Sequence, residues 1–245
     1  MSRHLLGMLT PSSNTVLEPV TSRILAGLPD ASAHFSRFRV TQIALSDQAL
    51  AQFQRGEILR AAELLGDAKC QTIAWNGTSA GWLGFDEDVG LCHEIAAATG
   101  AKACTSVLAL NEILALTGAR TLGLVTPYTP DVQARIIANY AAIGVQVVAE
   151  SHWGLRDNFS FSEVSGARIA AAVRTVAAAK PDAIAIFCTN LTGAPLVAEL
   201  EADLGIPIYD TVATAVWKSL LLCGANPARV TGWGRLFSYG ACAGR

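Results

Sequence analysis

A cysteine follows a short apolar run that the sequence predicts to be a buried strand. Ala183–Phe187 has isoleucine at alternating positions and leads directly into Cys188, Thr189 and Asn190. Ligands bind beyond the carboxyl ends of the strands in open parallel sheets, so a thiol placed there can meet a substrate. Near the start of the next helix its pKa can fall below the free value of about 8.5. Cys188 is therefore a candidate catalytic residue, and a buried, unreactive thiol is the alternative.

A second predicted strand end carries side chains that could hold a negatively charged oxygen. Thr72–Trp75 is followed by Gly77, Thr78 and Ser79, whose hydroxyl and backbone N–H groups could cradle a carboxylate or an enediolate. Tyr128 could add a phenol hydroxyl, and a thiol could then deliver a proton to the carbon beside the carboxylate. The alternatives are helix capping for Thr78 and Ser79 and an ordinary turn for Tyr128.

The chain contains an internal repeat, visible at three places in the same order. The matching pairs, at offsets of 116, 111 and 105 residues, are Leu5–Pro11 with Leu122–Pro127, Thr72–Ser79 with Ala183–Asn190, and Gly100–Val107 with Gly205–Val212. Slowly shrinking offsets are what two copies of one unit leave after loop deletions. The repeat places Gly77 opposite Cys188 and aligns Cys104 with Tyr209.

Within each copy, predicted strands alternate with predicted helices. The strands are His4–Leu9, His34–Val40, Thr72–Trp75, Ala101–Cys104, Thr121–Val125, Gln146–Ala149, Ala183–Phe187 and Pro207–Tyr209, with a last strand predicted at Arg229–Thr231. The helices are Thr15–Ala26, Asp47–Leu65, Val89–Ala98, Val107–Thr117, Asp131–Ala142, Glu163–Ala179, Ala194–Asp203 and Val212–Leu222. This alternation is typical of parallel strands with helices on both faces.

We therefore predict an α/β protein of two similar parallel-sheet, flavodoxin-like domains, related by pseudo-two-fold symmetry. The first domain covers residues 1–117 and is completed by residues 224–245, and the second covers residues 118–223. Two such domains facing each other leave one cleft between them, lined by strand-end loops from both. The active site is expected in that cleft.

Composition and charge exclude several classes of protein. Hydrophobic residues make up 51% and charged residues 16% of the chain, which is enough to bury a sizeable core. A net charge of −2 without a Lys/Arg run argues against nucleic-acid binding. No apolar segment is long enough to span a membrane, and the N-terminus lacks the pattern of a signal peptide, so a cytoplasmic location is expected. The six cysteines and four histidines lack disulfide-framework or metal-ligand spacing, so no metal is expected.

Five segments, in order along the chain, resemble the aspartate/glutamate racemase superfamily, in its branch of maleate cis-trans isomerases and arylmalonate decarboxylases. These segments are Thr10–Thr15, Gly77–Ser79, Thr126–Tyr128, Asp157–Asn158 and Cys188–Asn190. The resemblance implies a cofactor-free enzyme that acts on the carbon next to a carboxylate. It also implies that Asn14 and Asn158 hold a substrate carboxylate, and that Thr189 and Asn190 donate to the same ligand.

One departure from the racemase pattern concerns the first of two cysteines. Racemases and maleate isomerases of this group carry one cysteine from each copy, whereas this chain has Gly77 at the first position and Cys188 at the second. The arylmalonate decarboxylases resemble this arrangement, with Gly-Thr-Ser first and a single cysteine that protonates an enediolate. The Thr189-Asn190 pair resembles the maleate isomerases instead. Cys104-Thr105-Ser106 imitates the first cysteine motif, but the repeat makes Cys104 a buried strand residue with Ser106 as a helix cap.

Three functions therefore remain open at the level of sequence. The first is a decarboxylase-like lyase that acts on a small disubstituted malonate, with Cys188 as the general acid. The second is an isomerase or racemase of a small dicarboxylate, which needs a nucleophile that the sequence does not show near Gly77. The third is a carboxylate-binding protein without catalysis. The expected partner is a small carboxylate or dicarboxylate, and assembly into a homo-oligomer stays open.

Overall fold

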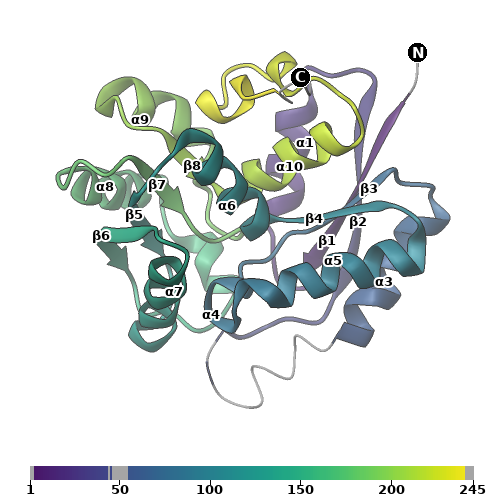
Figure 1. The fold of residues 1–245 in the computed structure, drawn as a ribbon, viewed down its shortest axis with the longest axis horizontal. Helices are drawn as coiled ribbons and strands as arrows, with labels where there is room; N and C mark the ends of the chain where they lie inside the picture. The colour runs from purple at the N-terminus through teal and green to yellow at the C-terminus, as the bar shows by residue number, and fades with distance from the viewer. Residues whose placement is uncertain (1–2, 44, 46–54, 241–245) are drawn as a thin grey trace.

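The computed structural model describes residues 3–43, 45 and 55–240 of the 245-residue chain. Its strands form two separate four-stranded sheets, and all the strand pairs within each sheet are parallel. In Figure 1 the two sheets lie side by side, with helices around and between them. This arrangement confirms the predicted α/β class with two similar parallel sheets.

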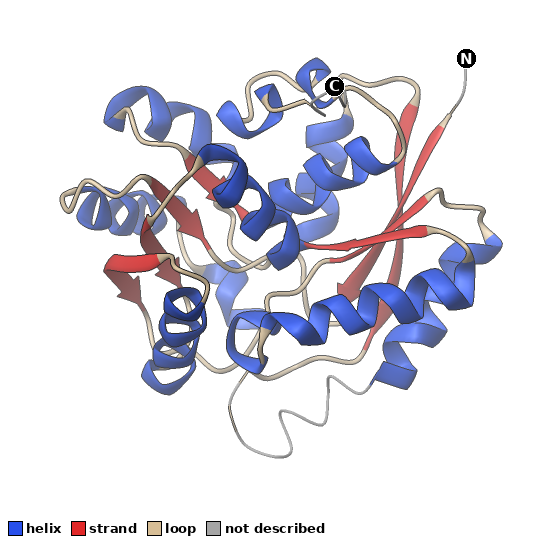
Figure 2. Cartoon of the chain, in the orientation of Figure 1, coloured by secondary structure: helices blue, strands red, loops and turns tan. Residues whose placement is uncertain are grey.

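The first sheet has the strand order β2-β1-β3-β4. Its strands are β1 (His4–Pro11), β2 (Ala31–Phe38), β3 (Thr72–Trp75) and β4 (Lys102–Thr105). All four residues of β3 are buried, because a central parallel strand is covered on both faces. Figure 2 shows these strands in red with helices in blue on both sides of them.

The second sheet repeats this order as β6-β5-β7-β8. Its strands are β5 (Thr121–Thr126), β6 (Gln146–His152), β7 (Ala183–Ile186) and β8 (Ile208–Asp210). The central strand β7 is again fully buried, which explains its continuous apolar sequence.

Strand registers in the two sheets confirm the alignment of the repeat. Gly7 lies beside Ile73 in the first sheet, and Gly123 lies beside Ile184 in the second. Gly123 is 116 residues after Gly7 and Ile184 is 111 residues after Ile73, which are the offsets read from the sequence. Gly77 follows Ile73 by four residues, and Cys188 follows Ile184 by four residues. Gly77 and Cys188 therefore occupy equivalent places at the ends of β3 and β7.

Helices cover both faces of each sheet. Those of the first half are α1 (Leu17–Leu25), α3 (Arg55–Asp67), α4 (Ala80–Leu83), α5 (Phe85–Thr99) and α6 (Ser106–Thr117). Those of the second half are α7 (Pro130–Ala142), α8 (Gly166–Ala177), α9 (Val197–Leu204) and α10 (Thr211–Leu222), with the short 3-10 helices η2 (Phe159–Glu163) and η3 (Ala194–Leu196). The first part of the predicted helix Asp47–Leu65, residues 47–54, lies outside the described residues.

Helix α10 belongs to the second half by sequence but packs against β3 and β4 of the first sheet and against α1 and α6. Most side chains of α10 are buried, including that of Trp217. The two halves therefore share a helical layer that lies between their sheets. The division of the chain at residues 117 and 223 into two domains stays a prediction.

The predicted last strand at Arg229–Thr231 is wrong. This segment instead forms the 3-10 helix η4 (Pro227–Arg229) and continues to η5 (Arg235–Ser238). Gly232 and Gly234, which separate the two, have positive φ angles of 82° and 90°, so the backbone turns instead of extending. Arg229 pairs with Asp30 at 2.7 Å, and the Arg235 N–H donates to Glu201, so the segment contacts both halves.

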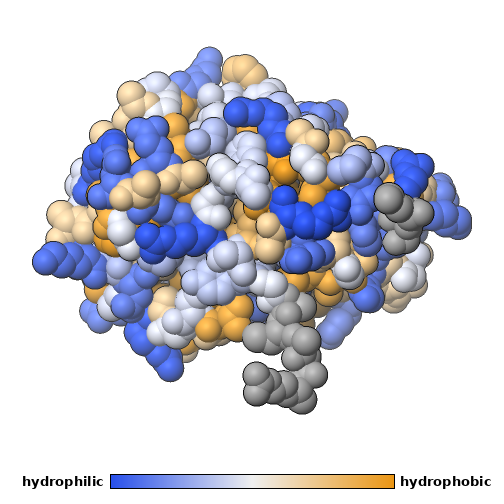
Figure 3. Space-filling model, turned by 90° about the horizontal axis from the view of Figure 1, so that it is seen from above, coloured by the Kyte–Doolittle hydropathy of each residue, from blue (hydrophilic) through white to orange (hydrophobic). Residues whose placement is uncertain are grey.

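The surface mixes hydrophilic and hydrophobic residues over the face shown in Figure 3. Among the described residues, no helix is both long and apolar enough to cross a membrane.

Candidate active site

One cavity collects the loops that follow six strands of the two sheets. The space between these loops that no atom fills is about 290 Å³, part of it open to solvent. Its lining residues are Pro11, Val40, Ile43, Trp75, Gly77, Thr78, Ser79, Trp82, Tyr128, Asn158, Cys188 and Thr189. Seven of the nine residues proposed from the sequence are among them, because the carboxyl ends of parallel strands meet at one edge.

Cys188 follows β7 and is only 3% exposed. Burial raises the pKa of its thiol to about 12, although the Tyr128 hydroxyl and the N–H groups of Asn190 and Leu191 act in the opposite direction. The Asn190 N–H lies 3.4 Å from the sulfur atom. The sequence-based expectation of a lowered pKa is therefore wrong, since loss of solvation outweighs these donors. A thiol in this state is protonated at neutral pH and can donate a proton.

Hydroxyl groups and backbone amides from the β3 end form the polar wall of the cavity. The Thr78 hydroxyl lies 2.5 Å from the Tyr128 hydroxyl, which in turn hydrogen-bonds the Cys188 thiol. The Ser79 hydroxyl forms no hydrogen bond with another described residue, and the same holds for the N–H groups of Thr78 and Ser79. These free donors suit a carboxylate or enediolate oxygen beside the thiol.

Asn158 and Thr189 line the cavity but have protein partners as well. The Asn158 amide donates to the Ser13 hydroxyl at 2.8 Å. The Thr189 hydroxyl donates to the Asn76 carbonyl at 3.0 Å and accepts from the Asn14 amide at 3.2 Å. Their orientation is thus fixed by contacts between the two halves of the chain.

Asn14 and Asn190 lie behind the wall of the cavity instead of lining it. Asn14 Oδ1 accepts from the N–H groups of Val16 and Leu17, at 3.0 and 2.9 Å. Asn190 Oδ1 accepts from the Thr15 N–H at 3.0 Å, and its amide donates to the Asn158 carbonyl at 2.6 Å. The first N–H groups of a helix need acceptors, and both asparagines are used for that purpose here. These contacts give both asparagines a positioning role, and their direct contact with substrate stays a prediction.

Replacing Asn190 by alanine is expected to lower the free energy of unfolding by about 2–4 kcal/mol, because it leaves buried N–H and carbonyl groups without partners. Urea denaturation measures this loss. Asn139 is a matched control, because it is partly buried and forms a single hydrogen bond to the Gly81 carbonyl. A loss for Asn190→Ala no larger than that for Asn139→Ala would contradict the bridging role.

Asp210 does not line the cavity but affects the pKa of Cys188, and the sequence reasoning missed it. It is fully buried at the end of β8, where Oδ1 accepts from the N–H groups of Val212 and Ala213 and caps α10. Its Oδ2 atom lies against Gly193, where an added Cβ would come within 2.7 Å. Burial raises the pKa of Asp210 to about 7, and its charge contributes to the raised pKa of Cys188. The one signal in the sequence for Asp210 is its position between a predicted strand and a predicted helix, where an aspartate commonly caps the helix.

Asp210→Asn is expected to change how stability depends on pH. The folded protein holds the Asp210 proton up to a pKa of about 7, whereas an unfolded chain releases it near 3.8. Stability therefore falls as pH rises from about 4 to 7, and asparagine, which can still cap α10, removes that fall. The variant should match the wild type near pH 4 and exceed it by on the order of 4 kcal/mol at pH 8.

Urea denaturation across this pH range checks the effect of Asp210→Asn. Asp182 is the opposite control, because hydrogen bonds from Arg120 and Thr121 lower its pKa. Asp182→Asn should therefore lose stability above pH 4. A constant difference between Asp210→Asn and the wild type at every pH would refute the buried titration.

The apolar wall of the cavity includes Val40 and Ile43, which the sequence reasoning did not select. They follow β2, and the Ile43 N–H donates to the Arg156 carbonyl at 2.9 Å. An antiparallel bridge between Gln42 and Asp157 lies beside this contact, so the wall joins the two halves. Lysine, arginine and histidine are absent from the described lining residues. The donors that the described lining offers to a bound carboxylate are therefore all neutral.

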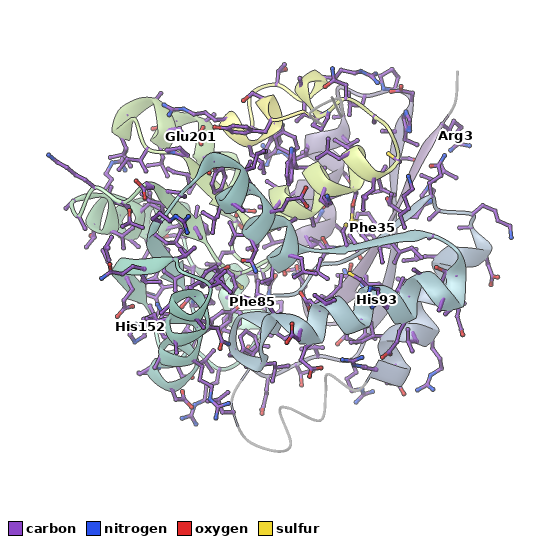
Figure 4. All side chains as sticks on the ribbon, viewed as in Figure 1. Arg3, Phe35, Phe85, His93, His152 and Glu201 are labelled. Carbon is purple, nitrogen blue, oxygen red and sulfur yellow. The ribbon has the colours of Figure 1, made fainter. Side chains whose placement is uncertain are left out.

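The other described cysteines and the four histidines are not among the residues that line this cavity. Cys104 is buried in β4, and burial raises its pKa to about 11, as expected of a packing residue. Thr105, instead of the expected Ser106, caps α6 by accepting from the Leu108 N–H. His93 on α5 and His152 at the end of β6 lie far apart in Figure 4. Within the described residues no cluster of His, Cys, Asp or Glu could hold a metal.

Two sheets of one topology, with a thiol and hydroxyl donors at their facing strand ends, define the class of the aspartate/glutamate racemase superfamily. The model of the arylmalonate decarboxylase family matches residues 14–237, and the chain belongs to this family. This confirms the resemblance to the branch that contains the decarboxylases and the maleate isomerases, all of them enzymes.

Relatives of both kinds are similar to the chain. A maleate isomerase from Nocardia farcinica is 27% identical over 241 residues, 94% of each chain. An arylmalonate decarboxylase from Bordetella bronchiseptica is 30% identical over 143 residues, 57% of this chain and 59% of that protein. The crystal structure of a maleate isomerase from Pseudomonas putida with maleate has a TM-score of 0.89 at 22% identity, covering 98% of this chain and 99% of the other.

Proposed function

We propose that the protein is a carboxy-lyase that decarboxylates a small disubstituted malonate. The observation that carries this proposal is the single thiol among the described residues that line the cavity. Cys188 lines it, whereas the equivalent position in the first half is Gly77. Racemisation through two bases needs an acid–base side chain in each half, and glycine has none. One proton donor is sufficient for decarboxylation.

The proposed reaction uses the polar wall and the thiol in turn. One carboxylate of the malonate binds to Ser79, the Tyr128–Thr78 hydroxyl pair and the free backbone N–H groups. The bond to the other carboxylate breaks, carbon dioxide leaves, and the electron pair becomes an enediolate held by the same donors. Cys188 transfers its proton to the α carbon, and solvent then returns a proton to the thiolate.

The apolar wall favours the bond that breaks. A carboxylate placed against Val40 and Ile43 lacks both water and a counter-charge, so its charged form is raised in free energy. Carbon dioxide is neutral and tolerates an apolar surface. The difference lowers the barrier to its departure.

Isomerisation of maleate is the second candidate function. Thr189 and Asn190, together with the full-length similarity to maleate isomerases, favour it. It requires a nucleophilic thiolate, but burial keeps the Cys188 thiol protonated, and no second thiol lines the cavity in the described part of the chain. A non-catalytic carboxylate-binding protein is the third.

Proton NMR in heavy water separates these functions. The protein is incubated with 2-methyl-2-phenylmalonate, with maleate and with single enantiomers of aspartate and glutamate. The proposal expects a monocarboxylic acid that carries one deuterium at the α carbon, and no product from Cys188→Ala. Fumarate from maleate, or deuterium exchange into an amino acid without decarboxylation, would transfer the assignment to the isomerase. An unchanged panel would contradict the lyase.

We also infer the setting in which the protein acts. The five cysteines within the described residues are free thiols, which suits a reducing cytoplasm. A small dicarboxylate is the expected partner. A homo-oligomer is a further expectation, which size-exclusion chromatography with light scattering would test.

A further inference from the structure

The indole of Trp75 fills the space that a side chain at position 77 would need. A Cβ atom added to Gly77 would lie 1.9 Å from Trp75 Cζ2 and 2.4 Å from both Cε2 and Cη2. Contacts below 3.0 Å are essentially never seen for real Cβ atoms. Trp75 and Gly77 are two residues apart and face the same cavity. Glycine is thus required at this position by the ring beside it.

The ring cannot easily move away. Trp75 is 1% exposed, and its ring packs against Phe38 with 5.1 Å between centroids. Side chains in such surroundings occupy one rotamer, and extra atoms force strained packing.

We propose that Trp75 determines the reaction specificity of the site by occupying the place of a second acid–base side chain. This inference rests on the proposed lyase function. Because Gly77 is the equivalent of Cys188 in the repeat, the indole covers the position from which a second proton could be delivered. Proton transfer is then one-sided, and a chiral product forms as one enantiomer that the enzyme does not racemise.

A thermal unfolding cycle tests the steric part without any substrate. Gly77→Ala in the wild type is expected to lower the midpoint by roughly 3–10 °C, because a methyl group is forced into the ring. In the Trp75→Leu background, which lacks the three atoms nearest to the added Cβ, Gly77→Ala should change the midpoint by less than about 2 °C. Trp82→Leu is the matched control, since Trp82 lines the same cavity but is not among those nearest atoms. An equal loss in all backgrounds would overturn the proposal.

Product racemisation tests the catalytic part. A single enantiomer of 2-phenylpropionate is incubated in heavy water with Gly77→Cys, with Trp75→Leu and with the double variant. The double variant is expected to racemise it at least about 10-fold faster than either single variant, because only there can two thiols reach the ligand. Equal racemisation by Gly77→Cys alone would show that Trp75 does not control the position.

The two measurements keep this inference separate from the proposed function. If the wild type decarboxylates no malonate, the lyase assignment fails, and the thermal cycle still decides whether Trp75 excludes a side chain at position 77. If the wild type is a lyase that itself racemises its product, the function holds and the one-sided role of Trp75 is refuted.

Discussion

Cys188→Ala is expected to lower kcat for decarboxylation by about 10²–10⁴-fold, because no other described group lining the cavity can donate a proton as readily to the α carbon. Cys188→Ser should lose nearly as much, since a serine hydroxyl is a far weaker acid. Steady-state kinetics with carbon dioxide release as the readout measures both. The binding of the malonate, measured by calorimetry, should change little.

Cys104→Ala is the matched control for the loss of a buried thiol. Cys104 is buried in the first half and has a raised pKa like Cys188, but it does not line the cavity. It should lose stability and keep its turnover. If Cys188→Ala remained as active as Cys104→Ala, the lone thiol would not be the acid.

Tyr128→Phe is expected to lower kcat by about 10²–10³-fold with a smaller change in KM. The phenol hydroxyl links Thr78 to the Cys188 thiol, so its removal takes away a donor to the enediolate and a partner of the acid. Because the donor is needed most when negative charge develops, the effect falls on the chemical step. Steady-state kinetics at saturating substrate measures it.

Tyr140→Phe serves as the control for Tyr128→Phe. Tyr140 on α7 is equally buried, and its hydroxyl has no hydrogen-bond partner among the described residues. Deleting that hydroxyl should leave kcat unchanged and stability equal or higher. Similar losses of kcat in both variants would mean that Tyr128 acts through packing alone.

The repeat allowed much of the fold and the site to be predicted from the sequence. Matched strand ends follow from local apolar patterns, and parallel topology brings those ends together. This was enough to place Gly77, Tyr128 and Cys188 around one cavity. The short helix α4 was not predicted, because four residues give no helical periodicity.

Contacts between distant segments set the limit of the prediction. The amides of Asn14 and Asn190 were available to a ligand in sequence terms. In the structure their oxygens accept from N–H groups at the start of α1, and their NH2 groups donate to Thr189 and Asn158. The pKa of Cys188 depends on how completely neighbouring segments exclude water, which no local pattern reveals. The conflict between Trp75 and a side chain at position 77 appears only when the ring has a defined orientation.

The absence of cations from the described cavity lining has a consequence for how substrate affinity responds to salt. Screening acts on pairs of full charges, so a dianion held by hydroxyl and amide dipoles should bind with nearly the same KM at low and high ionic strength. When Asp210 is ionised, above its pKa of about 7, it adds negative charge instead of neutralising it. Carbon dioxide leaves without charge, so the enediolate keeps both negative charges until Cys188 protonates the α carbon. That proton transfer leaves a monocarboxylate in the cavity and one charge on the thiolate, so relief of uncompensated charge on the ligand belongs to the protonation step.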